Sequence, residues 1–268
     1  MERSDPRYQA YVEILKEELI PAMGCTEPIA LAYAAAKARE VLGVLPESVQ
    51  LQVSGSIIKN VKSVIVPNTG HLKGMEAAAA AGIIAGSAEK ELEVIAEVST
   101  DKQAAIRDYL QTVPISIEHI EQGHVFDIIV TERCGDAWAK VRIADFHTNI
   151  CLIEKDGKVL YEKPLADEAA QESSRADRSL LNMKDIWEFA ETADLRDVAD
   201  LLERQIRYNN AIAEEGLLGD YGANIGRVLL STYGNDVSNR AKAKAAAGSD
   251  ARMNGCELPV IINSGSGN

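Results

Sequence analysis

One cysteine lies where a helix is expected to begin. Residues Pro21 to Pro28 read PAMGCTEP and precede an alanine-rich run. Pro28 fits the first turn of a helix, because the N–H that proline lacks would have no partner there. Thr26 is then the expected N-cap, and the Glu27 carboxylate lies where the helix dipole favours an anion. The same field is expected to lower the pKa of the Cys25 thiol, which would make the sulfur a nucleophile or a metal ligand.

Cys25 has a second interpretation, in which Gly24 and Cys25 form only a tight entry into the helix. The thiol would then pack as a small apolar group. The chain has three other cysteines, Cys134, Cys151 and Cys256, and the four are widely spaced without a CxxC pair. This spacing supports neither a disulfide framework nor a zinc ribbon. The cysteines are therefore expected to be buried thiols, or ligands that the fold gathers from distant positions.

Two polar segments beside predicted strands could bind an anion or carry a proton. The first, Val66 to Gly74, reads VPNTGHLKG, and its backbone N–H groups could hold a carboxylate or a phosphate. The second, His147-Thr148-Asn149, lies between two predicted strands, where a histidine can carry a proton or bind a ligand. Each segment could equally be a plain turn, with His147 solvated and Asn149 stabilising the turn. The histidines form no HxxxH or HxH pair, so a zinc site is not expected.

Two glycine-containing segments have weaker patterns. Asn263 to Asn268 reads NSGSGN, which could cradle an anion or could be a flexible terminus. Gly216 to Gly226 separates two helical patterns and does not follow a strand, so it is not a dinucleotide-binding fingerprint.

The composition indicates a soluble globular protein. A chain of 268 residues with 46% hydrophobic content can form one large or two ordinary domains with a buried core. Its formal charge of −13 argues against non-specific binding to nucleic acid or to an anionic membrane. The sequence shows neither an apolar run long enough to cross a bilayer nor a signal-peptide pattern. We therefore expect a cytoplasmic protein whose partner is a small molecule or another protein.

The hydrophobic periodicity predicts an α+β fold in three parts. The first part, residues 1–47, forms N-terminal helices, and the second, residues 48–163, forms an inserted α/β sheet domain. A linker over 164–182 leads to the start of an all-helical domain over 183–268. The predicted helices are 6–20, 26–43, 73–88, 101–112, 183–192, 195–214, 222–231 and 235–247. The predicted strands are 49–53, 61–66, 92–98, 115–120, 126–131, 137–143, 150–154 and 159–161, with a hairpin turn at Asp156-Gly157.

Five segments together resemble a known family, the iron–sulfur-dependent L-cysteine desulfidases, which are related to the alpha chain of bacterial L-serine dehydratase. The matching segments are PAMGCTEPIALAYAAA (21–36), IIKNVKSVIVPNTG (57–70), HTNI (147–150), EEGLLGDYGANIG (214–226) and SDARMNGCELPVIINSGSGN (249–268). They extend from one end of the chain to the other, and the GCTEP and SDARM…NSGSGN elements are specific.

The resemblance implies a cytosolic lyase with a [4Fe-4S] cluster, one iron of which is left open to bind substrate as a Lewis acid. A base removes the α-proton of the amino acid, and the β-substituent leaves. The resulting aminoacrylate hydrolyses to pyruvate and ammonia, and for L-cysteine the leaving group is sulfide.

The resemblance also assigns roles to residues. Cys25 is the predicted cluster ligand, and Cys25, Glu27 and His147 are the predicted catalytic residues. Thr26 and Glu27 are candidates to hold the carboxylate or the ammonium group of the substrate. The other predicted substrate-binding residues are Lys59, Asn60, Asn68, Thr69, Gly70, Asn149, Asn263, Ser264 and Ser266.

The chain departs from the family pattern at its end, because family members continue past the SGSGN motif through helices that hold further cluster cysteines. Cys256 is the one other candidate ligand, while Cys134 and Cys151 match no motif. We therefore expect the 268-residue chain alone to carry no cluster and to be inactive. Exposed apolar surface on its helices would favour a homo-oligomer. The alternative functions are an L-serine dehydratase of the same chemistry and a non-catalytic amino-acid-binding protein.

Overall fold

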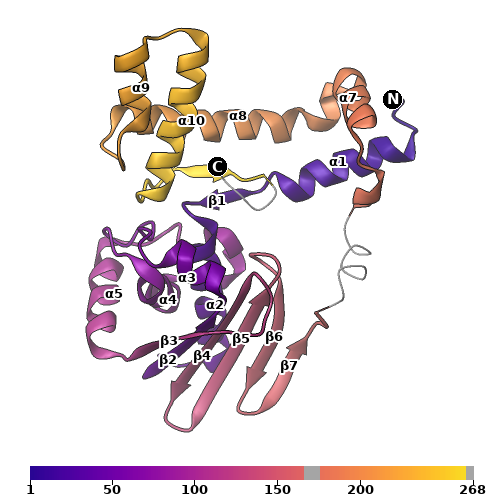
Figure 1. Cartoon of the computed structure of the whole chain (residues 1–268). Helices are drawn as coiled ribbons and strands as arrows, with labels where there is room; N and C mark the ends of the chain where they lie inside the picture. Colours follow the sequence, from indigo (N-terminus) through magenta and orange to yellow (C-terminus); the bar gives the residue numbers. More distant parts are fainter. Residues whose placement is uncertain (166–175, 264–268) are drawn as a thin grey trace.

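The computed structural model describes residues 1–165 and 176–263, and these form an α/β layer and a helical layer. Figure 1 shows the α/β layer at the bottom and the helices of the two chain ends lying across its top. The helical layer contains the first helix and the segments after residue 176, so the chain leaves this layer and later returns to it.

The α/β layer is built on one mixed sheet of six strands in the order β3-β2-β4-β5-β6-β7. Strand β2 pairs parallel with β3, and every other neighbouring pair is antiparallel. Alternation along β2 buries Val49, Leu51 and Val53, as expected for a sheet with one covered face. The strands are β2 (Ser48–Val53), β3 (Ile115–His119), β4 (Asp127–Cys134), β5 (Ala137–Ala144), β6 (Ile150–Lys155) and β7 (Lys158–Glu162).

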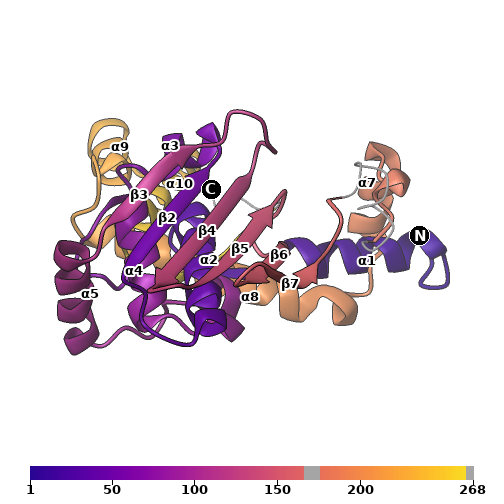
Figure 2. The same cartoon turned by 90° about the horizontal axis from the view of Figure 1, so that it is seen from below.

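Helix α2 (Thr26–Leu42) packs on the covered face against β4 and β5, and α4 (Gly74–Ala85) packs on the other side of α2. Figure 2 shows the sheet from below, with α2 behind it. The small side chains of both helices permit a very close approach. The backbones come so close that a Cβ at Gly82 would lie 2.1 Å from the carbonyl oxygen of Ala32. Twelve of the 17 residues of α2 are buried, and its solvent-accessible polar residues, such as Lys37 and Glu40, lie in its C-terminal half. The layer also contains α3 (Gly55–Val61), the 3₁₀ helix η1 (Ala88–Glu93) and α5 (Thr100–Thr112).

The helical layer is held at one end by aromatic packing. Tyr8 and Tyr11 of α1 meet Phe189 of α7 edge-on, with ring centroids 5.2 and 5.4 Å apart. None of the described helices is both long enough and apolar enough to cross a membrane. The helices are α1 (Pro6–Glu18), η3 (Arg178–Leu180), α7 (Met183–Thr192), α8 (Leu195–Leu218), α9 (Ile225–Tyr233) and α10 (Val237–Met253).

Two short strands join the start of the chain to its end. Strand β1 (Pro21–Met23) pairs antiparallel with β8 (Pro259–Ile261). The backbone continues this pairing, because the Ile262 N–H donates to the carbonyl of Ile20 over 2.9 Å. This ladder fixes the segment just before α2 against the segment just after α10.

The predicted α+β class is confirmed, but two predicted strands are wrong. Val61 is the last residue of helix α3, and residues 62–66 form turns with a single bridge from Ile65 to Lys73. Ile57 and Val61 are both buried and are one helical turn apart, so the helical period there outweighs the β-branched composition. Residues 92–98 fall in the end of η1 and in turns. Strands β1 and β8 were not predicted. Of the predicted linker, residues 166–175 lie outside the described residues.

A buried acid lies beneath α2 in the α/β core. Glu132 of β4 is fully buried, and neither of its carboxylate oxygens has a hydrogen-bond partner among the described residues. Burial raises the pKa of Glu132 to about 9, and the positive charge of Arg39 only partly opposes this effect. The Nε of Arg39 is also buried without a partner. The native protein therefore carries a neutral carboxylic acid in its core at neutral pH.

Replacement of this acid tests the assignment. The native state keeps the Glu132 proton up to about pH 9, whereas the unfolded chain releases it near the ordinary value of 4.5, so stability falls as pH rises between these values. Glu132→Gln should remove this loss and raise the free energy of unfolding by roughly 3 kcal/mol at pH 7. Urea unfolding of both proteins between pH 5 and pH 9 measures the difference. The control is Glu121→Gln, at an exposed position. Parallel pH profiles for wild type and Glu132→Gln would contradict the assignment.

Candidate functional site

The candidate site is at the N-terminus of α2, where a glycine turn leads from β1 into the helix. Gly24 has φ +65°, a conformation that favours glycine. A Cβ on Gly24 would lie 2.4 Å from Cγ of Pro67, so the turn over 66–70 packs directly against it. The two motifs that the sequence analysis treated separately are therefore in contact.

The N-cap of the helix lies one position earlier than predicted. Cys25 is the N-cap residue, and Thr26 and Glu27 are the first two helical residues. Pro28 is the third and stays within the first turn, where the missing N–H carries no penalty. The predicted Thr26 N-cap is wrong, because the Thr26 hydroxyl donates to the neighbouring Glu27 carboxylate over 3.3 Å.

The Glu27 carboxylate gathers the donors of this site. The Cys25 Sγ–H donates to Oε2 of Glu27 over 2.9 Å, and Nδ2 of Asn60 donates to Oε1 over 3.1 Å. Cys25 and Thr26 are almost fully buried. Asn60 comes from α3, so the carboxylate joins two helices of the α/β layer.

The thiol of Cys25 is not activated in this arrangement. Burial raises the pKa of Cys25 to about 12, and the negative charge of Glu27 and the hydrogen bond to it add to the rise. Arg252 acts in the opposite direction but does not overcome them. The expectation of a lowered pKa was therefore wrong. The helix N-terminus also carries the Glu27 carboxylate, which accepts a hydrogen bond from the protonated thiol.

Glu27 and His147 form an acid and base pair with separated protonation states. Burial alone would raise the pKa of Glu27, but the Cys25 hydrogen bond, the helix backbone, His147 and Asn60 outweigh it and lower the pKa. Burial lowers the pKa of His147, Glu27 partly opposes this, and Arg252 lowers it further. Nε2 of His147 is buried without a hydrogen-bond partner among the described residues, and its ring packs on Phe126 with centroids 4.5 Å apart. At neutral pH the site therefore holds a carboxylate beside a neutral imidazole.

The sequence analysis did not single out Arg252, which the structure places at the site. This α10 residue is only 3% exposed, and its Nε donates to the carbonyl of Gly24 over 2.8 Å. Burial lowers its pKa, while the neighbouring Cys25 and Glu27 raise it. A signal was present, because Arg252 is a charged residue within the specific segment SDARMNG.

Of the other predicted substrate-binding residues, Asn60 alone has a hydrogen bond to Glu27 in the described structure. Lys59, its neighbour on α3, is exposed. Nδ2 of Asn149 donates to the carbonyl of Ala144, and its Oδ1 accepts from Lys163. Asn263 follows β8, and Ser264 and Ser266 lie outside the described residues.

The predicted anion turn over Val66 to Gly74 uses its side chains to hold itself together. Asn68, at φ +59°, donates from Nδ2 to the carbonyl of Ile95 over 2.8 Å. Thr69 is fully buried, and its hydroxyl donates to the carbonyl of Val66 over 2.7 Å. Gly70 has φ +68°, and its carbonyl accepts from Arg107. These contacts favour the alternative interpretation, in which the segment is a structural turn. Through Pro67, this turn packs against Gly24.

The other cysteines lie in different surroundings. Cys256 is buried, and Tyr221 lies within hydrogen-bonding reach of its sulfur. The Cys151 thiol donates to the carbonyl of Arg142 within the sheet, and Cys134 ends β4. Within residues 1–165 and 176–263, no three side chains among His, Cys, Asp and Glu are grouped so that they could hold a metal ion. These residues therefore do not form a complete cluster site.

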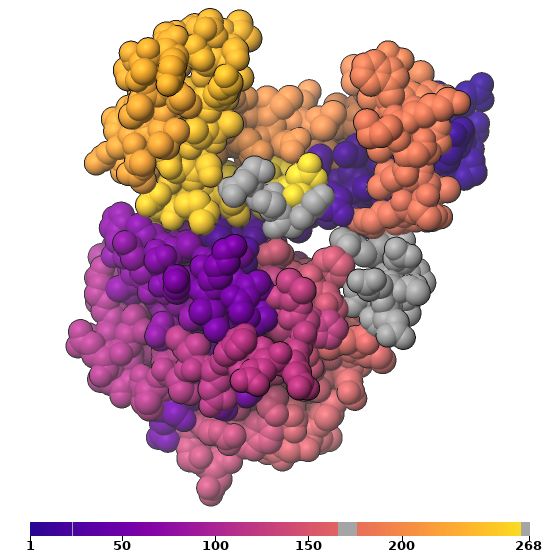
Figure 3. Space-filling model, viewed as in Figure 1, coloured from indigo at the N-terminus to yellow at the C-terminus, as the bar shows by residue number. Residues whose placement is uncertain are grey.

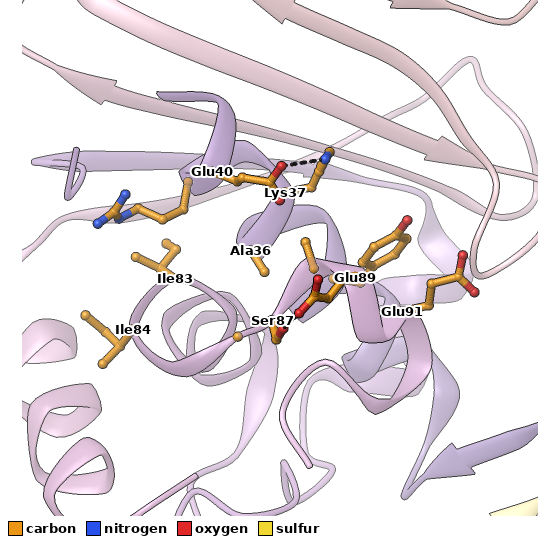
Figure 4. A pocket seen from close by; sticks show the side chains of 12 residues that line it. Ala36, Lys37, Glu40, Ile83, Ile84, Ser87, Glu89 and Glu91 are labelled. Carbon is orange, nitrogen blue, oxygen red and sulfur yellow. Dashed lines mark hydrogen bonds and ion pairs between the residues drawn. The ribbon is translucent and has the colours of Figure 1, made fainter. Parts of the chain in front are cut away.

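A large cavity between described residues lies away from this site. It has a volume of about 670 Å³ and lies along the C-terminal half of α2, beside the segment that follows α4. Figure 4 shows Lys37 paired with Glu40 on one side of it and Glu89 and Glu91 on the other. Because α2 rises about 1.5 Å per residue, Lys37 lies about 18 Å along the helix from Cys25. We assign the chemistry to the N-terminal site, since perturbed acid, base and thiol groups meet there.

Comparison with known proteins shows the family of this chain. The family profile named "Serine dehydratase alpha chain" matches residues 89–268. The chain belongs to the serine dehydratase alpha-chain family. A "UPF0597 protein" of Desulfitobacterium hafniense is 59% identical over 268 residues, which is 100% of this chain and 62% of that protein. The "UPF0597 protein" of Lachnoclostridium phytofermentans is 49% identical over 261 residues, covering 97% of this chain and 62% of the relative.

The coverage is similar for more distant members. The "UPF0597 protein" of Treponema denticola is 42% identical over 267 residues, which is 98% of this chain and 62% of that relative. The chain of this serine dehydratase alpha-chain family member thus spans about 62% of the length of these three relatives.

The protonation of Cys25 can be tested by alkylation. Glu27→Gln removes the neighbouring negative charge, so the pKa of Cys25 should fall and its alkylation by iodoacetamide at pH 9 should become faster. Arg252→Gln removes a positive charge and should slow the same reaction. Peptide mass spectrometry follows each cysteine separately, and Cys151 in the sheet is the internal control. Equal rates of Cys25 alkylation in wild type and Glu27→Gln would show that the carboxylate does not raise the pKa of the thiol.

Proposed function

We propose that this chain provides part of the active site of a lyase that eliminates the β-substituent of a small L-amino acid. The observation that carries this proposal is the meeting of Cys25, Glu27, His147 and Arg252 at the N-terminus of α2. Membership of the serine dehydratase alpha-chain family supports the reaction class.

The chain's own residues can perform the proton transfer of such an elimination. His147 is neutral at neutral pH and presents a buried Nε2 without a described partner, as a general base requires. It would take the α-proton of the amino acid, and the Cα–H electron pair would form the double bond as the bond to the β-substituent breaks. Glu27 stays ionised and would stabilise the imidazolium that forms. The aminoacrylate product would hydrolyse to pyruvate and ammonia.

Substrate binding would use the charges around the same helix end. The N-terminus of α2 and the Arg252 guanidinium give a positive potential that suits the substrate carboxylate. Thr26 lies in the first turn of that helix, and Asn60 fixes the Glu27 side chain from α3. Water is largely excluded, because Cys25, Thr26 and Arg252 are each less than 5% exposed.

We further propose that Cys25 is the one ligand that this part of the family contributes to a [4Fe-4S] cluster. When bound, such a cluster would supply Lewis acidity toward the leaving group. The described residues bring one thiol to the site and do not complete a ligand set, so the remaining ligands would belong to the part of the longer relatives that this chain does not span. Cys25 would release its proton on ligation, and Glu27, its hydrogen-bond acceptor, would pass that proton on to solvent and return to its ionised form before catalysis.

We propose L-cysteine as the substrate, with sulfide as the leaving group, and L-serine as the alternative. The family description names serine dehydratase, and this name favours L-serine as the substrate. The same arrangement of active-site residues would serve either amino acid. The two substrates differ in the leaving atom alone, so turnover has to decide between them.

Turnover is the direct test. The chain should be prepared anaerobically with iron and sulfide, alone and co-expressed with the part of the Desulfitobacterium hafniense relative that lies outside the match. We expect pyruvate from L-cysteine, with one sulfide released per pyruvate, from the co-expressed pair and not from the chain alone. His147→Asn should lower the rate at least about a hundredfold, because general-base catalysis contributes on this scale. Cys25→Ser should lower the rate as well, because it removes the proposed cluster ligand.

The control variant for this assay is Glu121→Gln, at an exposed position. Turnover by the chain alone would contradict the shared-site proposal. Formation of pyruvate from L-serine but not from L-cysteine would show that the protein acts as an L-serine dehydratase. Binding of either amino acid without turnover by the pair would replace the lyase with an amino-acid-binding protein.

A further inference from the structure

Strand β7 is the last strand of the sheet, and its outer edge pairs with no other strand among the described residues. All five of its residues are exposed, and they include three consecutive apolar side chains, Val159, Leu160 and Tyr161, which are 49%, 52% and 45% exposed. Figure 1 shows β7 at the lower right of the sheet, and Figure 3 shows the salmon-coloured surface of this segment at the same border of the molecule. The free edge of a strand is a template for pairing with another chain.

The sequence of β7 is complementary to itself when two copies run antiparallel. The strand reads KVLYE from Lys158 to Glu162. When Leu160 of one copy lies opposite Leu160 of the other, Lys158 of each copy lies opposite Glu162 of the other copy. In the same register, Val159 of each copy lies opposite Tyr161 of the other. Opposite charges, and an aromatic residue beside a β-branched one, are favourable cross-strand pairs.

The charges also select this register over its neighbours. A shift by one residue would bring Lys158 opposite Lys163 of the second copy, and like charges directly opposite each other are destabilising. A shift in the other direction would bring Lys158 opposite Tyr161 and leave Glu162 opposite Gly157. Two ion pairs between the strands therefore form only in the register with Leu160 at the centre.

We propose that β7 is the contact of a homodimer, in which the β7 strands of two copies pair antiparallel and join two six-stranded sheets into one. The second copy is the occupant that the self-complementary charges favour. The sheet's other edge strand, β3, reads ISIEH and has no lysine or arginine, so two copies of it could not form such lysine–glutamate pairs. The inference does not depend on the proposed reaction.

A β-bulge lies at the centre of the proposed contact. The ladder between β6 and β7 shifts its register between Ile153 and Glu154, and Leu160 has no partner on β6. The extra residue of a bulge is left unpaired by the neighbouring strand. In the dimer, Leu160 would lie at the twofold axis and pack against Leu160 of the second copy. A contact of one strand with its own copy closes after two chains, as in most homodimers.

Exchange of the two charges tests the register. Sedimentation equilibrium of the 268-residue chain should show a dimer of twice its 29.0 kDa mass. Lys158→Glu places carboxylates opposite each other at both ends of the contact, and Glu162→Lys does the same with ammonium groups. Each substitution should weaken the dimer about tenfold. The double variant with both substitutions restores opposite charges and should recover the wild-type dissociation constant.

The matched control is Lys184→Glu, which reverses the charge of an exposed lysine on α7 and should leave the dimer unchanged. Leu160→Asp places two carboxylates at the twofold axis and should abolish the dimer. Circular dichroism and thermal unfolding establish that each variant is folded. A monomeric wild-type chain would overturn the proposal. Equal dissociation constants for wild type and the single variants, or a double variant that stays as weak as they are, would overturn it as well.

Discussion

The structure depends on the close packing of α2 between the sheet and α4. Alanine and glycine allow the two helices to touch at backbone distance, as at Gly82 and Ala32. A helix packed at this distance between two neighbours cannot shift or rotate without opening the core, because protein interiors are close-packed. The N-terminus of α2, with Cys25, Thr26 and Glu27, is therefore held in one place. Side chains at this helix end are therefore attached to a rigid part of the core.

The helical layer closes on this fixed point through residues from the far end of the chain. The β1–β8 ladder holds the entry to α2, and Arg252 reaches the carbonyl of Gly24. A Cβ on Gly255 would lie 2.5 Å from the Ile65 side chain, so a third contact forms nearby. These contacts bury a charged residue against the helix start. The site exists only when the two layers are assembled.

The electrostatics of the site follow from this burial. In water, a thiol at a helix N-terminus would lose its proton more readily. Here the helix end carries Glu27, which remains ionised through its hydrogen bonds and keeps the proton on Cys25. His147 is kept neutral by the same burial. The three groups therefore divide the roles of anion, proton donor and base among themselves, as active sites that handle protons commonly do.

The sequence determined the elements with strong local signals. Gly43 ends α2 in the left-handed conformation that glycine permits, and the polar caps Asn182 and Asp194 precede α7 and α8. It also indicated the start of α2 as the candidate site, because Glu27 and Pro28 suit a first helical turn and the family resemblance rests partly on the GCTEP segment. Tertiary structure decided what local composition could not. The β-branched run from Val61 to Val66 is not a strand, since Val61 ends helix α3 and the chain then turns toward α4. The raised pKa of Cys25 and the role of Arg252 depend on burial and on a contact across 228 residues, and neither is encoded in any local segment.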